Sequence, residues 1–455
     1  MLDAVPFTLK SGETVKHMKS DFTVSTANGV TWSLFKGGAL GTTGHGLKLS
    51  GNNVTVTATT AASDTLTVTR GNDFRIYILK VVPDEFEGAG TEANPYLIKT
   101  KDDLMKIRNA VDLQLYDYTG TYFKLANDID MGGNSGFFGM SVHGAYYAFN
   151  GTLDGNGHSI KNWQANRSIG SNGDFIANTE NYMAGLFIYT GLKSVIKNLN
   201  IASDCQVTGG SYVAGVAAYN SGRIENCRNF ATVKATKTAA AGVAAYNAAG
   251  ATVTGCYNAG TITSGGTVAG GIVGTNLGAI ELSQNDGNVG VAVLTSLESD
   301  STSLKTAGGI AGENGGTMAN VANLGHVSAG GEVGGIAGNN AYKTTVTGLI
   351  AAGTVESFSD QKTLGAVFGK HNTSSAVVTD GYYDSQLAGK NAGNAQAVDG
   401  ITASTTASLV SGDTIKGIAT AHWSYAKGQY PVLKAFASEP ASVFNRANYI
   451  EFASE

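Results

Sequence analysis

Two pairs of polar residues in the first half of the chain have the types and spacing needed to bind a cation or to act on a glycan. The first pair, Asp128 and Asp130 in NDIDMGGN, alternates along a predicted strand, so both carboxylates point to one face. This arrangement suits a calcium ion, but it equally suits a solvated surface, and no further carboxylates lie nearby in sequence. We therefore expect no bound metal and no cofactor here, and we keep Asp128 and Asp130 as candidate ligand-binding residues.

The second pair, Asp154 and His158 in LDGNGHS, resembles the polar turns of polysaccharide-cleaving β-helix enzymes. Glycoside hydrolysis needs two carboxylates at a defined separation, which the sequence does not reveal. The run Asp-Gly-Asn-Gly is also a simple turn between two strands. We expect a turn that contributes to binding, and we keep catalysis at Asp154 as the alternative.

Tyrosine side chains offer a third kind of chemistry, because sugar rings can stack on exposed aromatic rings. Tyr146 and Tyr147 are the first candidates. Tyr219 and Tyr246 stand at equivalent positions of two repeats, so we expect them to stack on each other as part of the scaffold. The other candidates are Tyr257, Tyr382 and Tyr383.

Three cysteines, Cys205, Cys227 and Cys256, are too few for a disulfide framework, and no CxxC motif suggests zinc. Cys227 and Cys256 occupy matching positions of adjacent repeats. Parallel side chains in register have Cβ atoms about 4.8 Å apart, somewhat too far for a disulfide. We expect buried free thiols.

The stretch AGGIAGENGG (307–316) looks like a phosphate-binding loop, but its core recurs along the chain. Its seven copies are AGLFIYTG, AGVAAYNSG, AGVAAYNAAG, GGIVGTNLG, GGIAGENGG, GGIAGNNAY and GAVFGKHNT, anchored at residues 185, 215, 242, 271, 309, 335 and 366. A phosphate loop occurs once and opens a helix. A repeat of this length, made of short strands and turns, instead predicts a solenoid with about one coil per repeat.

An asparagine follows five residues after five of the anchors. These residues are Asn220, Asn247, Asn276, Asn314 and Asn340. Equivalent positions stack in a solenoid, and stacked asparagine side chains can bond along the axis as a ladder. The first and last copies carry Thr190 and His371 in this position, as expected of atypical terminal repeats.

Composition narrows the function classes. Of 455 residues, 62 are Gly, 5 are Pro and 14 % are charged, which favours a β protein with many turns and excludes collagen. The formal net charge of −5 and the lack of a long basic run argue against nucleic acid as a partner. No apolar run is long enough to span a bilayer, so any membrane attachment is expected through an anchor outside this chain.

We predict an all-β chain with three parts. Residues 1–88 read as short alternating strands of an immunoglobulin-like β-sandwich. Residues 89–386 form a right-handed parallel β-helix, and one short helix over 99–111 caps its start. Thr100 can cap this helix, which has Leu104, Ile107 and Val111 on one face. Residues 387–455 form a C-terminal capping segment.

The repeats resemble the GLUG repeat of large bacterial surface proteins, over roughly residues 88–386. The entry phrase GTEANPYLI (90–98), YFKLANDIDM (122–131), LDGNGHSIKN (153–162) and the ending WSYAKGQYPVLKAF (423–436) carry the same resemblance. It implies an adhesin, or the accessory region of an immunoglobulin-A-specific metallopeptidase. The peptidase chemistry needs an H-E-x-x-H helix, and none of the seven histidines here is followed by Glu.

We therefore expect a non-enzymatic, extracellular, cell-surface binding protein, monomeric, that recognises host or dietary glycans or glycoproteins. Two alternatives stay open. One is a polysaccharide-cleaving β-helix enzyme. The other is a spacer or accessory fragment of an immunoglobulin-A peptidase-like surface protein.

Overall fold

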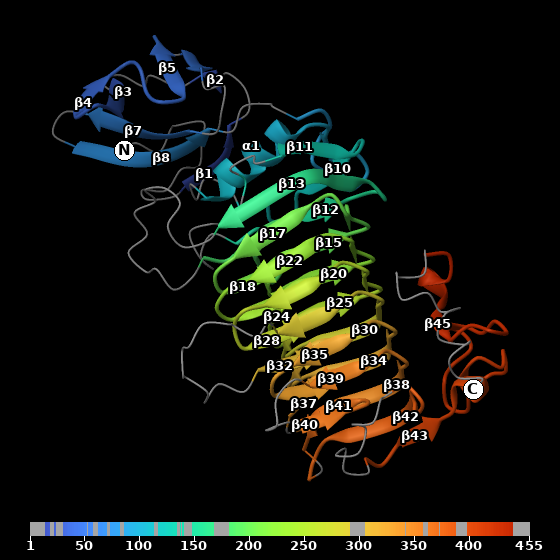
Figure 1. Cartoon of the computed structure of the whole chain (residues 1–455). Coiled ribbons are helices and arrows are strands. Elements are labelled where there is room, and N and C mark those ends of the chain that lie inside the picture. Colours follow the sequence, from blue (N-terminus) through green and yellow to red (C-terminus); the bar gives the residue numbers. More distant parts are fainter. Residues whose placement is uncertain are drawn as a thin grey trace.

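The computed structural model of the chain describes residues 14–18, 22–23, 31–51, 53–57, 62–70, 73–81, 86–112, 117–133, 137, 139–140, 148–167, 182–291, 305–341, 343–357, 363–372, 374–387 and 398–439. Figure 1 shows two smaller parts attached to a long stack of strands. The stack determines where every candidate residue lies.

The N-terminal part contains two β-sheets. A five-stranded sheet has the order β1-β8-β7-β3-β4, and a three-stranded sheet has the order β2-β6-β5. Their strands are β1 Thr14–Met18, β2 Phe22–Thr23, β3 Thr31–Lys36, β4 Ala39–Gly41, β5 Leu47–Ser50, β6 Asn53–Val56, β7 Ala62–Arg70 and β8 Asp73–Val81. Alternating residues such as Leu47 and Leu49 are buried, as expected for strands with one face on a core.

One helix, α1 (Lys101–Asp112), stands at the start of the stack, and it confirms the predicted helical segment (Figure 1). The Thr100 hydroxyl accepts from the Asp103 N–H at 3.3 Å, and the Asp103 carboxylate accepts from the Thr100 N–H at 3.0 Å. This reciprocal pair closes the first turn as a capping box does. Leu104, Ile107 and Val111 join the interior core of the stack.

The stack is a parallel β-solenoid of about eight turns, as the repeats predicted. Each full coil contains short segments in a fixed order. The chain passes through the long wall, then a segment after the bend, then a strand of what we call the third wall, and finally one strand in each of two shorter sheets. The long wall contains β9 Tyr96–Ile98, β10 Tyr122–Leu125, β12 Thr152–Asp154, β15 Val195–Lys197, β20 Arg223–Glu225, β25 Thr252–Thr254, β30 Ala279–Asn285, β34 Thr317–Asn323, β38 Thr345–Ala351 and β42 Val377–Asp384. After the bend come β11 Ile129–Gly133, β13 Ser159–Arg167, β16 Asn200–Ile201, β21 Arg228–Asn229, β26 Tyr257–Asn258 and β43 Ile401–Ser404.

The third wall and the two shorter sheets complete each coil. The third wall contains β17 Gln206–Gly209, β22 Thr232–Ala235, β27 Ile262–Ser264, β31 Val289–Val291, β35 Val327–Ala329 and β39 Val355–Ser357. The six-stranded sheet contains β18 Tyr212–Ala214, β23 Ala239–Ala241, β28 Val268–Gly270, β32 Thr306–Gly308, β36 Glu332–Gly334 and β40 Thr363–Gly365. The seven-stranded sheet contains β14 Phe187–Thr190, β19 Ala217–Asn220, β24 Ala244–Asn247, β29 Val273–Asn276, β33 Ala311–Asn314, β37 Ala337–Asn340 and β41 Phe368–His371.

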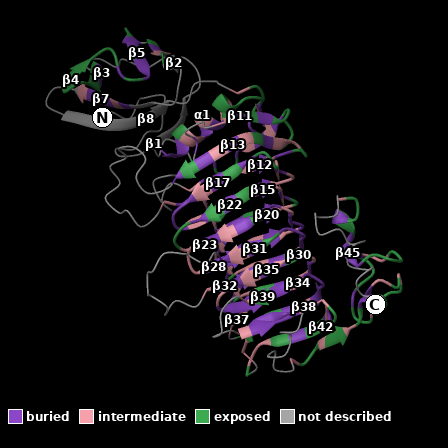
Figure 2. Cartoon of the chain, in the orientation of Figure 1, coloured by how far each residue is buried: buried purple, intermediate pink, exposed green. Residues whose placement is uncertain are grey.

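Equivalent residues of successive coils pair in register, so like side chains stack along the axis. In the long wall the inward residues Leu153, Ile196, Ile224, Val253, Ile280, Met318, Val346 and Val378 form one such column. All of them are buried in one continuous core, and Figure 2 shows the buried residues running along the strands. Fully burying each aliphatic side chain contributes about 1.5–3 kcal/mol, so the column is a main source of stability.

In each of these coils, one residue at the bend of the long wall has a positive φ. This position holds Asn198, Asn226, Gly255, Leu282, Asn320, Gly348 and Asp380. Asn, Asp and Gly tolerate this left-handed conformation, whereas a branched side chain such as Leu282 is strained there. Leu282 packs against the hydrophobic cluster formed with the C-terminal segment, and this contact offsets the strain.

Residues 406–439 form an arm that lies along the outside of the solenoid (Figure 1). It contains α2 Thr406–Leu409, β44 Trp423–Ser424, β45 Val432–Leu433 and the short 3-10 helix η3 Lys434–Phe436. Trp423, Leu433 and Phe436 are buried in one cluster with Tyr257 and Ile350 of the coils. The W…YPxL segment, within residues 423–436, therefore attaches the arm to the coils.

Candidate functional site

The predicted candidates Asp128 and His158 do meet, on the outside of the first coils. The Asp128 carboxylate accepts from the Ser159 N–H at 2.9 Å and pairs with Lys161 Nζ at 2.5 Å and with His158 Nδ1 at 3.4 Å. The hydrogen bond from Lys161 holds the pKa of Asp128 below its usual value. The Asp128 carboxylate is thus bound by residues of the neighbouring coil, and these contacts link the two coils.

Asp130 lies one alternation further along β11 and is also satisfied within the chain. Its Oδ1 accepts from the Gly132 N–H at 2.7 Å and from Asn162 Nδ2 at 3.1 Å. Among the described residues, no group of three or more His, Cys, Asp or Glu side chains is arranged to hold a metal ion.

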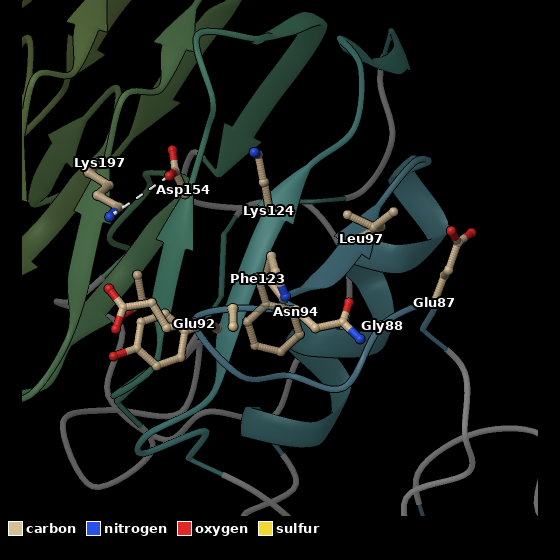
Figure 3. Close-up of a pocket in the computed structure, with 13 residues that line it drawn as sticks. Glu87, Gly88, Glu92, Asn94, Leu97, Phe123, Lys124, Asp154 and Lys197 are labelled. Atoms are coloured by element: carbon tan, nitrogen blue, oxygen red, sulfur yellow. Dashed lines mark ion pairs between the residues drawn. The ribbon is translucent and has the colours of Figure 1, made fainter.

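Asp154 lies in a separate surface pocket of about 350 Å³, shown in Figure 3. Its Oδ1 accepts from the Asn156 N–H at 2.8 Å and from Asn198 Nδ2 at 3.0 Å, and Lys197 Nζ lies 3.8 Å from Oδ2. The first bond closes the predicted turn. The pocket is lined by Glu87, Gly88, Glu92, Ala93, Asn94, Pro95, Leu97, Tyr122, Phe123, Lys124, Thr152, Asp154 and Lys197.

All three cysteine thiols are buried and free. Cys227 Sγ approaches the Ile196 carbonyl at 3.6 Å, and Cys256 Sγ approaches that of Ile224 at 3.8 Å, so each thiol faces the backbone of the coil before it. Burial raises the pKa of Cys205 to about 12, and burial followed by the neighbouring Cys227 raises that of Cys256. Thiols in this state are poor nucleophiles.

The five asparagines of the repeat phrase form a continuous buried ladder. Each side-chain N–H donates to the next side-chain oxygen, at 2.8 Å for Asn220–Asn247, Asn247–Asn276 and Asn276–Asn314, and at 2.7 Å for Asn314–Asn340. Thr190 donates to Asn220 at one end, and Asn340 bonds to His371 Nδ1 at the other. The ladder is a structural feature that satisfies buried polar groups.

A second ladder runs through the bend of the coils, and sequence reasoning missed it. Asn229 donates to Asn258, Asn258 to Asn285, and Asn285 to Asn323, at 2.7–2.8 Å. The signal was present, because each residue occupies the same place in the second repeat phrase.

The aromatic residues divide by location. Tyr257 is buried beneath the arm, and its hydroxyl donates to Asp286 at 3.0 Å. Tyr382 donates to the Lys416 carbonyl at 2.7 Å, and Tyr383 packs partly buried against the core. Tyr146 and Tyr147 lie outside the described residues, directly before Ala148.

Tyr189, Tyr219 and Tyr246 stack on the outer face of the seven-stranded sheet, and we call them the tyrosine column. They are register partners on β14, β19 and β24. The rings of Tyr219 and Tyr246 stack with centroids 4.6 Å apart at 15°, and Tyr189 follows at 5.6 Å and 39°. The expected stacking of Tyr219 on Tyr246 is present, and Tyr189 extends it.

Tyr212 of β18 adds a perpendicular ring, 5.9 Å from Tyr246 at 79°. These side chains cover Met183, Ile188 and Ala218, a small cluster separate from the interior core. The four tyrosines are half-buried, and none of their hydroxyls donates to a protein acceptor within the described part of the chain. Burial raises the pKa of Tyr189, Tyr212 and Tyr219.

A second surface pocket, of about 370 Å³, adjoins the Tyr189 end of the column. We call it the column pocket, and it is lined by Asp117, Thr119, Ala148, Asn150, Tyr189, Thr190, Gly191, Leu192, Lys193 and Ser221. Leu192 is 81 % exposed, the largest exposed fraction among the large apolar side chains described. An aromatic wall, an exposed aliphatic group and several polar groups thus meet in one place.

Beyond Tyr246 the same outward position carries polar residues. Successive register partners are Thr275 on β29, Glu313 on β33, Asn339 on β37 and Lys370 on β41. The Thr275 hydroxyl donates to Glu313 Oε2 at 3.4 Å. Burial, with a further contribution from the charge of Glu332, raises the pKa of Glu313.

Glu332 itself is buried beside this row, with Lys370 Nζ 3.3 Å from its Oε1. Glu313 differs, because no cation pairs with its carboxylate in the described residues. The outer face therefore changes along the axis from aromatic to polar, with Glu313 as its unpaired acidic group among the described residues.

No known family profile matches the chain, so the GLUG resemblance stays a prediction. Two relatives share sequence with part of it. Halomucin of Haloquadratum walsbyi is 29 % identical over 222 residues, which is 48 % of this chain and 2 % of that protein. A protein named "Putative Gly-rich membrane protein" of Evansella cellulosilytica is 31 % identical over 146 residues, 30 % of this chain and 15 % of that protein. The chain thus spans a small part of either relative.

Among solved structures, that of a "putative immunoglobulin A1 protease" from Bacteroides ovatus is similar, with 20 % identity and a TM-score of 0.49, over 76 % of this chain and 94 % of that one. In the described part of this chain, no helix has the length and apolar character required to cross a membrane.

Proposed function

We propose that this chain is a non-catalytic binding segment of an extracellular surface protein, and that it recognises a glycan or glycoprotein through the tyrosine column and the column pocket. One observation supports this most directly. Four half-buried tyrosines stand together on the outside of the coils, and their column ends at a pocket of about 370 Å³. Aromatic rings supply stacking surface, while Asp117, Asn150 and Lys193 supply polar contacts.

The rigid scaffold supports the proposal. The ladder Asn220–Asn247 lies next to the stacked pair in the same two strands, so backbone and side-chain bonds both hold the rings. A preorganised binding face loses little conformational entropy when it takes a ligand. The N-terminal sheets, which we propose form an immunoglobulin-like module, and the solenoid would carry this face away from the cell.

The experiment is binding of the full chain to a glycan array and to immobilised host glycoproteins. We expect Tyr189→Ala to weaken binding about 10-fold, which corresponds to about 1.4 kcal/mol. Tyr122→Ala is the matched control, because Tyr122 lines the pocket of Figure 3 on another wall. Loss of binding in the control alone would move the site to that pocket, and absence of any binding would remove the proposal's support.

Polysaccharide cleavage at Asp154 has weaker support. Asp154 accepts two hydrogen bonds within the chain. Figure 3 shows Lys197 beside it. Hydrolysis needs a carboxyl group that is free to act on the leaving oxygen of the substrate, and these contacts already engage both oxygens of Asp154. An accessory role within a longer protein is compatible with binding and does not compete with it.

A further inference from the structure

One position interrupts the column of large side chains on the seven-stranded sheet. Tyr189, Tyr219 and Tyr246 place a ring at three successive coils, and the next coil places Thr275 there. The coil after that carries Glu313. We call this position the Thr275 step, defined by Tyr246, Thr275 and Glu313.

At this step the short Thr275 side chain stands between Tyr246 and Glu313. Adjacent strands lie about 4.8 Å apart, so the backbone positions of Tyr246 and Glu313 are about 9.6 Å apart along the axis. Stacked groups need about 3.5–4 Å between their atoms. A flat ring laid against Tyr246 would therefore lie over Thr275, beside the Glu313 carboxylate that reaches the Thr275 hydroxyl at 3.4 Å.

The surrounding groups are those that recognise a sugar. Tyr246 offers an aromatic face, and Tyr212 stands at 79° to it as a second wall. Thr275 and Glu313 offer a hydroxyl and a carboxylate. The hydrogen bond between these two groups is long, at 3.4 Å. The charge of Glu313 also contributes, after burial and Tyr246, to the raised pKa of Tyr212, so these groups share one environment.

The charges indicate which sugars fit. Glu313 has no pairing cation among the described residues, whereas the nearby Glu332 is paired with Lys370. A carboxylate can accept from two sugar hydroxyls, and it attracts an ammonium group. It repels the carboxylate of an acidic sugar, at a cost that partial burial increases.

We propose that the Thr275 step is a saccharide subsite that takes one neutral or amino sugar ring, stacked on Tyr246 and hydrogen-bonded to Glu313, and that it rejects acidic sugars. This inference rests on the proposed glycan-binding function. It adds a second contact point, two coils beyond Tyr219, so that an extended oligosaccharide can engage the tyrosine column and the step together.

The experiment measures binding of the full chain to three immobilised tetrasaccharides: cellotetraose (neutral), chitosan tetramer (amino) and tetragalacturonate (acidic). Thr275→Tyr fills the step with the missing ring, and Glu313→Gln removes the charge while keeping the shape. Thr345→Tyr makes the same change as the first variant on an exposed site of β38 in the long wall, and serves as the matched control.

We expect the wild-type chain to bind the neutral or the amino tetrasaccharide at least 10-fold more tightly than the acidic one. Thr275→Tyr should lose at least 10-fold in affinity, Glu313→Gln should lose affinity and most of the discrimination against the acidic probe, and Thr345→Tyr should change neither. Circular dichroism and thermal unfolding establish that each variant is folded.

Two results would overturn the subsite. If the wild type binds a neutral or amino probe and both step variants bind it equally well, the subsite is wrong, while glycan binding elsewhere on the column stands. Preferential binding of the acidic probe also contradicts the subsite alone. If the wild type binds none of the three, the subsite is refuted, and the separate array experiment with Tyr189→Ala still decides the wider function.

Discussion

At the scale of single residues, buried asparagine amides and one histidine determine how the coils stay in register. Asn276 shows the dependence most clearly, because it accepts from Asn247 and donates to Asn314, both at 2.8 Å. An amide inside a column of like amides has no route to water, so each rung must be made within the chain.

Replacing Asn276 with Ala should therefore lower the free energy of unfolding by about 2–6 kcal/mol, since two buried partners lose their hydrogen bonds at about 1–3 kcal/mol each. Chemical denaturation measures the change. Asn339→Ala is the control, because Asn339 is half-exposed on the outer row of β37, and we expect its effect within about 0.5 kcal/mol. Equal effects of the two substitutions would contradict a structural ladder.

His371 ends the ladder and makes it sensitive to pH. Asn340 Nδ2 donates to His371 Nδ1 at 3.0 Å, so the ring nitrogen must be unprotonated. Burial lowers the pKa of His371 in the folded chain, so the folded state binds this proton less readily than the unfolded state does. The stabilisation is fully present above the unfolded value of about 6.5 and is lost as the pH falls through it toward the folded value.

We expect hydrogen exchange of the β41 amides to accelerate between pH 7.5 and pH 5 after correction for intrinsic rates. In His371→Asn, an amide that does not titrate extends the ladder, and the difference between the two pH values should shrink. An unchanged pH dependence in that variant would assign the effect to another group, such as His326, whose pKa burial also lowers.

At the scale of elements, glycine determines how closely coils approach at the repeat phrase. A Cβ at Gly271 would stand 2.0 Å from the Gly309 carbonyl oxygen and 2.5 Å from Asn285 Cγ. The second asparagine ladder therefore occupies the space that a side chain would need. The repeated Gly of the phrase is required by packing between coils.

Gly271→Ala should cost about 3 kcal/mol or more, because both neighbours must move. At Gly290 of β31 a Cβ would meet Ser328 Oγ at 3.2 Å, and this side-chain oxygen can move aside. Gly290→Ala should change stability by less than about 1 kcal/mol. Thermal unfolding of the pair compares them, and a similar loss in both would show that backbone freedom matters more than space.

The arm depends on a buried polar centre. The Asp384 carboxylate accepts from the Tyr430 hydroxyl at 2.6 Å and from the Thr406 hydroxyl at 2.7 Å, and all three residues are buried. Burial and the adjacent carboxylate raise the pKa of Tyr430 far above its ordinary value. The hydroxyl therefore stays protonated and remains a donor at any physiological pH.

Tyr430→Phe should weaken arm attachment by about 1.5–3 kcal/mol, the range for a hydrogen bond to a charged group. Limited proteolysis within residues 405–439 measures the attachment. Tyr425→Phe is the matched control, because its hydroxyl donates to an uncharged acceptor, the Ile418 carbonyl, at 3.3 Å. Faster cleavage in the control than in Tyr430→Phe would contradict the role of Asp384.

At the scale of the whole molecule, the arm covers an apolar strip that the solenoid otherwise exposes. The strip includes Phe230, Tyr257, Leu282, Ala322, Leu324 and Ile350 from successive coils. The bonds that anchor the arm along it include Arg228 to Glu439 at 3.0 Å, the Leu433 N–H to Gln284 at 3.1 Å, and Trp423 Nε1 to Asn320 at 3.2 Å.

Truncation after Ser404 should expose this strip. We expect a several-fold increase in the fluorescence of a hydrophobic dye and self-association, because large exposed apolar patches promote both. Truncation after Glu439 keeps the arm and is the control. Dye binding and light scattering measure the two outcomes, and an unchanged signal after the first truncation would show that the strip is covered without the arm.

The sequence by itself determined the parallel stack, the capped helix at its start and the first asparagine ladder. The repeat spacing required equivalent residues to stack, and in-register pairing between neighbouring coils follows directly from that periodicity. The same logic would have found the second ladder, had the Asn of the second phrase been compared across repeats.

Only the tertiary structure decided which outer surfaces remain open. The arm meets coils more than 100 residues away, as Trp423 and Asn320 show at a separation of 103 residues, and no repeat period encodes such a contact. The bend between the two shorter sheets likewise brings Tyr212 beside Tyr246, two residues of different strands and coils. Periodicity fixes neighbours along the axis, whereas contacts around the coil depend on bend angles and on the docking of distant segments, and these decide where a ligand can bind.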